Sequence, residues 1–129
     1  MRAMPRYLFV CVENSCRSQM AEAFARMARV DAQSAGSRPS GVVNPKAIAA
    51  MEELGYDMGA HRSKSIEDAP EGPYDAVVTM GCGDACPHVP ARAHLDWEIP
   101  DPKHMTPDEF RRVRDRIAAQ VLALVQPSR

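Results

Sequence analysis

The first 28 residues constrain the fold most, because a strand-like pattern changes to a helical pattern across one short loop. Residues 6–12 (RYLFVCV) form a compact apolar run of strand-favouring type, which predicts a buried β-strand. From Ser18 onwards, apolar residues recur at helical spacing and share one face: Met20, Phe24, Met27 and Ala28. A strand that feeds a helix through so short a loop is typical of the first half of a β-α-β unit.

The rest of the chain continues this alternation. We predict a weak second strand at residues 31–35 that ends at Gly36, a buried strand at residues 74–80 (YDAVVTM), and a short strand at residues 94–98. The order of strands and helices predicts an α/β fold with a parallel sheet that helices cover on both faces. Ligands of such sheets bind at the carboxyl ends of the strands.

Two further helices have clear start signals. Asn44 and Pro45 are an N-cap and a first helical residue, and the apolar face that follows is Ile48, Met51 and Leu54, with Gly55 as the stop. Thr106 and Glu109 have the spacing of a capping box. The predicted inner face of that last helix is Phe110, Val113, Ile117, Val121 and Leu124, and the arginines at 111, 112, 114 and 116 are expected to form a solvated face.

Length and composition limit the class of protein. Residues 1–129 (14.2 kDa) are the size of one domain, and 16 basic against 17 acidic side chains argue against nucleic acid or an anionic membrane as partner. The longest apolar run, residues 7–12, is too short to span a bilayer or to form a signal-peptide core. We therefore expect a cytoplasmic protein, in which four cysteines have catalytic, redox or metal-binding roles more often than structural disulfides.

The loop between the first strand and the first helix has the composition of an anion site. A cysteine stands six positions before an arginine in the stretch CVENSCRS, and the backbone N–H groups of so short a loop converge at a helix N-terminus. We predict that a tetrahedral oxyanion binds to residues of this loop: Val12, Glu13, Asn14, Ser15, Cys16, Arg17 and Ser18.

Individual side chains of the loop have distinct expected roles. Arg17 offers a planar fork that matches two oxygens of the oxyanion, and the positive environment favours a reactive thiolate at Cys11. Ser18 can donate a hydrogen bond to that sulfur, and Asn14 tolerates the left-handed backbone that closes a tight loop. The alternative is an inert buried cysteine at a strand end, and the strand before it and the helix after it make this alternative the weaker one.

These motifs resemble a known family. The stretches VCVENSCRSQMAEAF, SAGS (residues 34–37), NPKAIAAMEELGYD and HRSKS are similar to the low-molecular-weight protein tyrosine phosphatases, and within that fold most of all to the thioredoxin-coupled arsenate reductases of the ArsC type. The resemblance runs from residue 6 to about residue 125. It implies a three-layer α/β/α fold with a four-stranded parallel sheet, Cys11 as nucleophile and Arg17 as oxyanion clamp.

The resemblance also assigns a general acid and shows one departure. An Asp-Pro pair after the last strand supplies the acid in the family, so the role falls on Asp101, provided that burial keeps its carboxyl protonated. Without the Cys11 loop, Asp101-Pro102 is read as a plain turn. Glu13 stands where the phosphatases usually have glycine, and we expect it to face solvent because a carboxylate beside an anion site is unfavourable.

Two features favour reduction over phosphate ester hydrolysis. Lys103 and His104 follow Asp101-Pro102 where phosphotyrosine phosphatases have aromatic rings, so the pocket suits a small inorganic oxyanion. Cys82 and Cys86 follow the third predicted strand, and a reductase needs such thiols as electron donors. In this interpretation Cys11 attacks arsenate, Cys82 attacks the Cys11 sulfur, and Cys86 carries the oxidation outward as a Cys82–Cys86 disulfide.

The electron donor and other readings stay open at this point. The relay cysteines of thioredoxin-coupled reductases are usually further apart, so a glutaredoxin with a small thiol remains an alternative to thioredoxin. A phosphatase that uses Cys11, Arg17 and Asp101 is the second enzyme reading. An oxyanion or metal sensor is the non-enzyme reading, with Cys82, Cys86, His88 and His94 as ligands.

The remaining expectations concern cofactors and minor residues. No organic cofactor and no metal are expected, although the resemblance suggests a monovalent cation near Asn14, Glu22 and Ser37. Cys16 is expected to be a packing residue, or to form a Cys11–Cys16 disulfide that shields the nucleophile. His61 and Lys64 are expected at the surface or in a supporting layer around the site.

Overall fold

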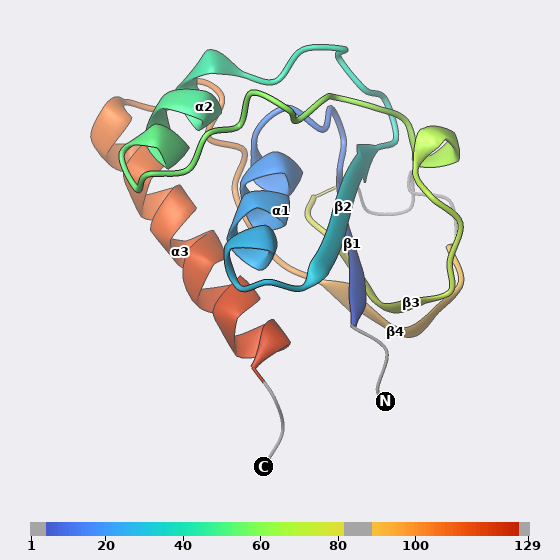
Figure 1. The fold of residues 1–129 in the computed structure, drawn as a ribbon. Helices are drawn as coiled ribbons and strands as arrows, with labels where there is room; N and C mark the ends of the chain where they lie inside the picture. The colour runs from blue at the N-terminus through green and yellow to red at the C-terminus, as the bar shows by residue number, and fades with distance from the viewer. Residues whose placement is uncertain (1–4, 82–88, 127–129) are drawn as a thin grey trace.

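Four parallel strands form one sheet in the computed structural model, which describes residues 5–81 and 89–126. The sheet order is β2-β1-β3-β4 (Figure 1), with strands β1 (Arg6–Cys11), β2 (Asp31–Gly36), β3 (Tyr74–Thr79) and β4 (Ala91–Asp96). The predicted fold class is confirmed. Because all four strands are parallel, the residues that follow them meet at one edge of the sheet.

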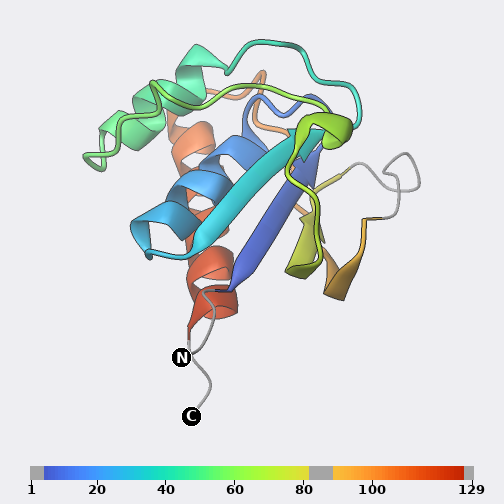
Figure 2. The same ribbon diagram turned by 45° about the vertical axis from the view of Figure 1, so that its right-hand side comes forward.

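The helices α1 (Arg17–Met27), α2 (Pro45–Glu52) and α3 (Pro107–Val125) lie together on one side of the sheet (Figures 1 and 2), so among the described residues the α-helices do not cover both faces as expected. Phe9 of β1 packs on this side with Met20, Met51 and Ile117 of the three helices. Leu8 and Val10 point to the opposite face, where the described cover is the segment around the 3₁₀ helix η1 (Ile66–Asp68). A strand buried on both faces explains the unbroken apolar run of the sequence.

Most predicted elements are confirmed, with errors at their ends. The last strand begins and ends earlier than residues 94–98, because an exposed edge strand carries no apolar pattern that marks its bounds. Met27 and Leu54, expected on inner helix faces, are 46% and 41% exposed. Met27 is the last residue of α1, and Leu54 lies beyond the end of α2, so neither reaches the core.

Helix α3 begins at the predicted capping box but corrects the expectation of a solvated arginine face. Thr106 and Glu109 exchange both hydrogen bonds of the box. Arg114, however, is buried: its guanidinium donates to the Ala50 carbonyl at 3.0 Å and pairs with Glu53 and Asp115. Arg114 therefore connects α3 to α2. Within residues 5–81 and 89–126, no helix has the length and apolar character needed to cross a membrane.

Candidate active site

The loop between β1 and α1 is closed by buried polar side chains around Cys11. Cys11 Sγ lies 2.9 Å from Ser18 Oγ, and the Asn14 side-chain amide donates to the same oxygen at 2.7 Å. Asn14 has φ = 51°, so it adopts the left-handed conformation predicted for it. Because Ser18 Oγ accepts from Asn14, its own proton is available to Cys11. The arrangement stabilises negative charge on the sulfur.

The start of α1 leaves its N–H groups open to a ligand. The N-cap residue, Cys16, makes no side-chain cap, and the first turn has no acidic residue. Unpaired N–H groups at a helix N-terminus bind anions. Gly36, at the end of β2, passes so close that a Cβ there would lie 2.6 Å from the Val12 carbonyl oxygen. A glycine at this position lets β2 run against the loop.

Arg17 is held in place from two sides. Its guanidinium is buried and donates from Nη1 to the Ile99 carbonyl at 3.0 Å. Gly81, two residues after β3, has φ = +83° and passes directly against the guanidinium, so that a Cβ at this position would overlap Nη1. The end of β3 and the segment after β4 thus orient the arginine that sequence analysis named as the clamp.

Asp101 reaches the site but is not buried. Its Oδ2 lies 3.8 Å from Arg17 Nη2, and 47% of its side chain is exposed. The structure therefore brings the predicted acid next to the clamp, while the burial that we set as a condition for this role is not met. The Lys103 backbone N–H donates to Asp101 Oδ1 at 3.0 Å and fixes the direction of the carboxylate.

Glu13 has a partner that the sequence did not reveal. Its carboxylate accepts from Lys103 Nζ at 3.0 and 3.1 Å, and its side chain is 38% exposed. The expectation that it faces solvent is correct only in part, because Lys103 covers it. Salt bridging to Glu13 raises the pKa of Lys103.

A buried hydrogen-bond chain supports Asn14 from behind the loop, and sequence analysis missed it. Gln19 Nε2 donates to Asn14 Oδ1 at 3.0 Å, and Gln19 Oε1 lies 2.9 Å from His61 Nδ1. His61 Nε2 in turn lies 2.8 Å from the Tyr56 hydroxyl. Burial lowers the pKa of His61, so the neutral ring donates to Gln19 and accepts from Tyr56. His61 therefore lies in the supporting layer around the site, which is one of the two positions expected for it, and its side chain is buried.

Cys16 differs from Cys11 although both are free and buried. Burial raises the pKa of the Cys16 thiol to about 11, and the nearby Asp101 and Cys11 add to the effect. Cys16 is thus a neutral thiol at pH 7, which agrees with a packing role.

The predicted relay cysteines, Cys82 and Cys86, lie outside the described residues, as does His88 of the metal alternative. In the part of the chain that the structure describes, no three His, Cys, Asp or Glu side chains form a group that could hold a metal ion. His94, the fourth suggested ligand, has its Nε2 2.6 Å from the Val89 carbonyl oxygen.

The monovalent cation suggested near Asn14, Glu22 and Ser37 stays a prediction, and the side chains of these residues make the following contacts. Both side-chain oxygens of Glu22 already accept hydrogen bonds, from Ser34 at 2.5 Å and from Arg26 at 2.8 Å. Asn14 Oδ1 accepts from Gln19 and from the Lys64 backbone. The Arg26 guanidinium already balances the Glu22 charge. Ser37 Oγ is buried and finds no partner among the described residues, but one hydroxyl is not a cation site.

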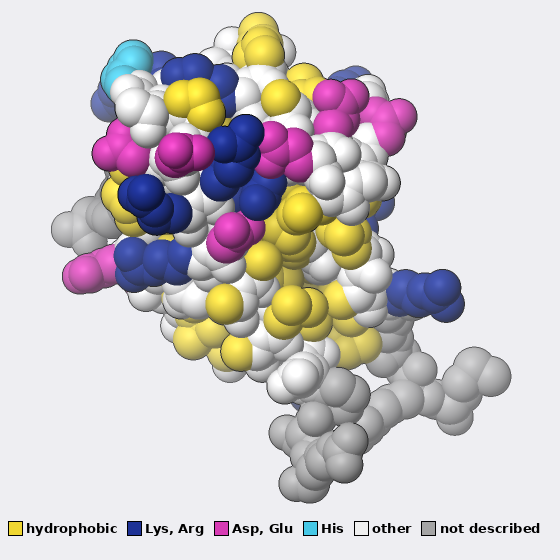
Figure 3. All heavy atoms as spheres, turned by 90° about the vertical axis from the view of Figure 1, so that its left-hand side faces the viewer, with side chains coloured by type: hydrophobic (Ala, Val, Ile, Leu, Met, Phe, Trp, Pro, Cys, Tyr) yellow, Lys and Arg dark blue, Asp and Glu magenta, His cyan; other side chains and the backbone are white. Residues whose placement is uncertain are grey.

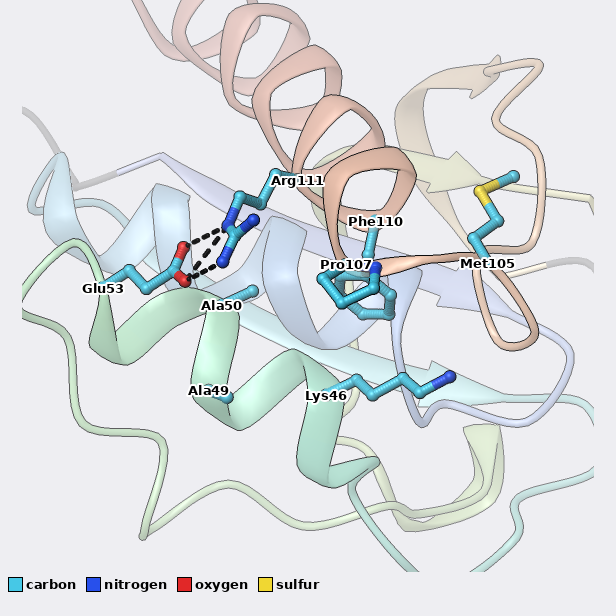
Figure 4. Close-up of a pocket in the computed structure, with 8 residues that line it drawn as sticks. All are labelled: Lys46, Ala49, Ala50, Glu53, Met105, Pro107, Phe110 and Arg111. Carbon is cyan, nitrogen blue, oxygen red and sulfur yellow. Dashed lines mark hydrogen bonds and ion pairs between the residues drawn. The ribbon is translucent and has the colours of Figure 1, made fainter.

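A second hollow lies between α2 and α3, away from Cys11. It is an apolar pocket of about 200 Å³, and the ion pair of Glu53 and Arg111 lies at one end of it (Figure 4). Figure 3 shows the same side of the molecule, where charged side chains gather over α2 and the start of α3, above a more apolar region. The pocket has no nucleophile or oxyanion-binding group, so the loop after β1 is the candidate active site.

Comparison with known proteins identifies the family. The model of the family described as low molecular weight phosphotyrosine protein phosphatase matches residues 6–127. The chain belongs to this family. The matched range contains the Cys11 loop, Asp101 and all four strands of the sheet.

Within the family, several of the similar proteins are named as arsenate reductases. The chain is 38% identical over 128 residues to the glutaredoxin arsenate reductase of Synechocystis sp., with 95% of this chain and 97% of that protein covered. It is 43% identical over 116 residues to an arsenate reductase of Staphylococcus aureus (strain Newman), with 84% and 87% covered. A solved arsenate reductase in the phosphate-binding state superimposes with a TM-score of 0.82 at 37% identity, with 95% and 97% covered.

Proposed function

We propose that this protein is an arsenate reductase that works on the phosphatase fold through cysteine chemistry. The observation that carries the proposal is the closed loop in which Ser18, bonded in turn by Asn14, contacts the Cys11 sulfur, while Arg17 at the start of α1 is fixed by the Ile99 carbonyl. The similar proteins named as arsenate reductases support the choice of substrate. The loop recognises shape and charge, so phosphate and sulfate should compete with arsenate for it.

The first step is nucleophilic substitution at arsenic. The N–H groups of residues 12–18 and the Arg17 fork bind the oxyanion, and the Cys11 thiolate attacks arsenic. An As–S bond forms while an As–O bond breaks, and Asp101 is the group that can deliver a proton to the departing oxygen. Arsenic is still pentavalent in this adduct.

The second step is the reduction, and it needs two further thiols. Cys82 attacks the Cys11 sulfur, the electron pair of the As–S bond passes to arsenic, and arsenite leaves. Cys11 and Cys82 are then joined by a disulfide, which accounts for the two electrons. Cys86 attacks Cys82, which frees Cys11 and leaves a Cys82–Cys86 disulfide. Met80 N donates to the Val10 carbonyl at 2.7 Å and Gly81 contacts Arg17, so the chain runs beside the loop up to the residue before Cys82.

The reductant and the compartment follow from this chemistry. The Cys82–Cys86 disulfide has to be reduced by a dithiol protein or a small thiol, and thioredoxin, or a glutaredoxin with a low-molecular-weight thiol, supplies such electrons. These systems act in the reducing cytoplasm, where we place the protein.

Phosphomonoester hydrolysis is the second candidate, because the family match and the Cys11, Arg17 and Asp101 arrangement serve it equally. Covalent phosphorylation of Cys11 would then be followed by water attack, with no change in thiol content. It is the weaker candidate because Lys103 and His104 stand directly after Pro102, where phosphotyrosine phosphatases have aromatic rings.

One measurement separates these two candidates. Reduced protein is mixed with arsenate in the absence of any external thiol, and free thiols and arsenite are counted after a single turnover. A reductase loses two thiols and releases about one arsenite per chain, because arsenic takes two electrons. Unchanged thiols together with efficient hydrolysis of an aryl phosphate would replace the proposal by the phosphatase.

The contact of Gly81 with Arg17 gives a further expected result. Gly81→Ala and Gly55→Ala place a side chain at nearly the same positive φ, +83° and +82°, so each should lose about 1–2 kcal/mol of stability. Only the Cβ at position 81 meets Arg17, whereas nothing lies within 4 Å of the one at position 55. Gly81→Ala should therefore also weaken oxyanion binding, by about tenfold for one displaced charge-assisted hydrogen bond.

Thermal unfolding and equilibrium binding of inorganic phosphate measure the two effects separately. The Gly55→Ala protein is the matched control, since it carries the backbone strain without the clash. Equal phosphate affinities for the two variants would show that Gly81 does not position Arg17.

A further inference from the structure

Lys103 joins the two loops that border the oxyanion site. Its Nζ donates to both carboxylate oxygens of Glu13, which belongs to the loop after β1, at 3.0 and 3.1 Å. Its backbone N–H donates to Asp101, in the loop that leads to α3, at 3.0 Å. Glu13 and Lys103 are 90 positions apart in the sequence. One lysine thus connects opposite sides of the site.

The loop that carries Lys103 has other fixed points. The Ile99 carbonyl accepts from Arg17 at 3.0 Å, and the Lys103 carbonyl accepts from Lys46 Nζ, on α2, at 3.0 Å. These bonds hold the backbone on both sides of Asp101. The contact with Glu13 is different, because it runs from side chain to side chain across the site.

The charges around the site alternate as a result. Glu13 is negative, Lys103 positive, Asp101 negative and Arg17 positive. The Lys103 ammonium group pairs with Glu13 and Arg17 pairs with Asp101, whereas Lys103 contacts Asp101 through its backbone N–H. Without Lys103, two carboxylates would border a loop that has to receive a polyanion. With Lys103 in place, Glu13 is neutralised and its side chain is held toward the acid loop instead of the incoming ligand.

We propose that the Glu13–Lys103 ion pair is a tie across the site that selects bare inorganic oxyanions over phosphate esters. A bare tetrahedral anion fits the loop with the tie closed. An ester carries an organic group that projects away from the loop holding the oxyanion, and in this proposal the tie obstructs the path of that group. The inference rests on the proposed function for its substrate, and Lys103 is a positioning residue because it acts through Glu13 and the acid loop.

Equilibrium binding of two unreactive probes tests the tie without any turnover. Inorganic phosphate represents the bare oxyanion, and phenylphosphonate represents an oxyanion with an organic group. Lys103→Met removes Nζ and leaves the backbone bond to Asp101, and Glu13→Gln removes the charge from the other side. The double variant Glu13→Lys with Lys103→Glu restores an ion pair in which the positive and the negative side chain have exchanged places.

Arg111→Met is the matched control. Arg111 pairs with Glu53 at 2.9 Å, with exposed fractions of 43% and 42%, close to the 40% and 38% of Lys103 and Glu13. The Arg111→Met protein loses one cation from an ion pair that is about as exposed as the Glu13–Lys103 pair, at a place remote from Cys11. Its ratio of the two dissociation constants should equal that of the wild-type protein.

The measured quantity is the phenylphosphonate dissociation constant divided by the phosphate dissociation constant. Exposed ion pairs make small contributions to binding, so Lys103→Met and Glu13→Gln should each lower this ratio by about two- to fivefold. The charge-swapped protein should return toward the wild-type ratio, even though both affinities change together.

Two results would overturn the tie. The ratio could stay unchanged in both single variants, or the charge-swapped protein could show the same low ratio as the single variants, which would mean that local charge and not the connection matters. Neither result depends on reduction. Failure of the proposed function would instead appear as wild-type protein that binds both probes and releases no arsenite.

Discussion

Cys11→Ser should abolish arsenate reduction, with a fall on the order of 10⁴-fold or more in turnover, because removal of a covalent nucleophile has effects of that size. Cys11 Sγ is buried at the end of β1, and a serine oxygen fits the same space. A serine hydroxyl is a much weaker nucleophile than a cysteine thiol, so the loop keeps its shape and loses its reactivity. Arsenite release with excess reductant measures the activity, and thermal unfolding shows that the fold is retained.

The other loop cysteine provides the contrast for this variant. Because the pKa of Cys16 is raised to about 11, Cys16 should not react with a limiting amount of iodoacetamide at pH 7, whereas Cys11 should. Phosphate should protect Cys11 from the reagent, since it occupies the loop. Labelling of Cys16 before Cys11, or appreciable turnover by Cys11→Ser, would mean that another residue starts the chemistry.

The local part of the site could be predicted because each role depends on near neighbours in sequence. Cys11, Asn14, Arg17 and Ser18 lie within one strand–loop–helix unit, so spacing alone brought them together. The same holds for the capping box of α3, whose Thr106 and Glu109 stand three positions apart. In these stretches, backbone geometry converts sequence distance directly into spatial distance.

The supports of the site could not be predicted because they come from distant segments. His61 is 42 positions from Gln19, and Lys103 is 90 positions from Glu13. A single polar residue carries no periodicity that announces a buried partner. The weak signal that did exist was chemical: Glu13 is an unexpected carboxylate in an anion loop, and such a charge requires a cation close by.

Contacts between distant segments also explain why the exposure of some side chains was predicted wrongly. Arg114 looked like one of several solvated arginines, since helix spacing shows which residues share a face and not what that face contacts. Its position against Ala50 of α2 and against Glu53, the residue directly after α2, follows from how the two helices pack. Edge strand β4 was misplaced by a related effect, because its exposed residues do not alternate between core and solvent.

The relay gives the second large expected effect. Cys82→Ser should form the covalent arsenic adduct on Cys11 and then stop, so that little arsenite appears without added thiol, because no second thiol attacks the Cys11 sulfur. Cys86→Ser should release about one arsenite per chain and then stall as a Cys11–Cys82 disulfide. The stalled protein should resist a bulky reductase, since Cys11 is only 2% exposed. Wild-type protein should end as Cys82–Cys86 and be reduced by thioredoxin.

Non-reducing peptide mapping after a single turnover distinguishes these states, and Cys16→Ser is the control for disulfides within the loop. The order of attack follows from the chain path: β3 ends beside β1, Gly81 contacts Arg17, and Cys82 is the next residue, whereas Cys86 comes four positions later. A Cys11–Cys16 disulfide as the wild-type product, or full multiple turnover by Cys86→Ser with thioredoxin, would refute the relay. A mixed disulfide between Cys11 and a small thiol would instead assign the reduction to the glutaredoxin route, in which the Cys82–Cys86 pair is not the electron carrier.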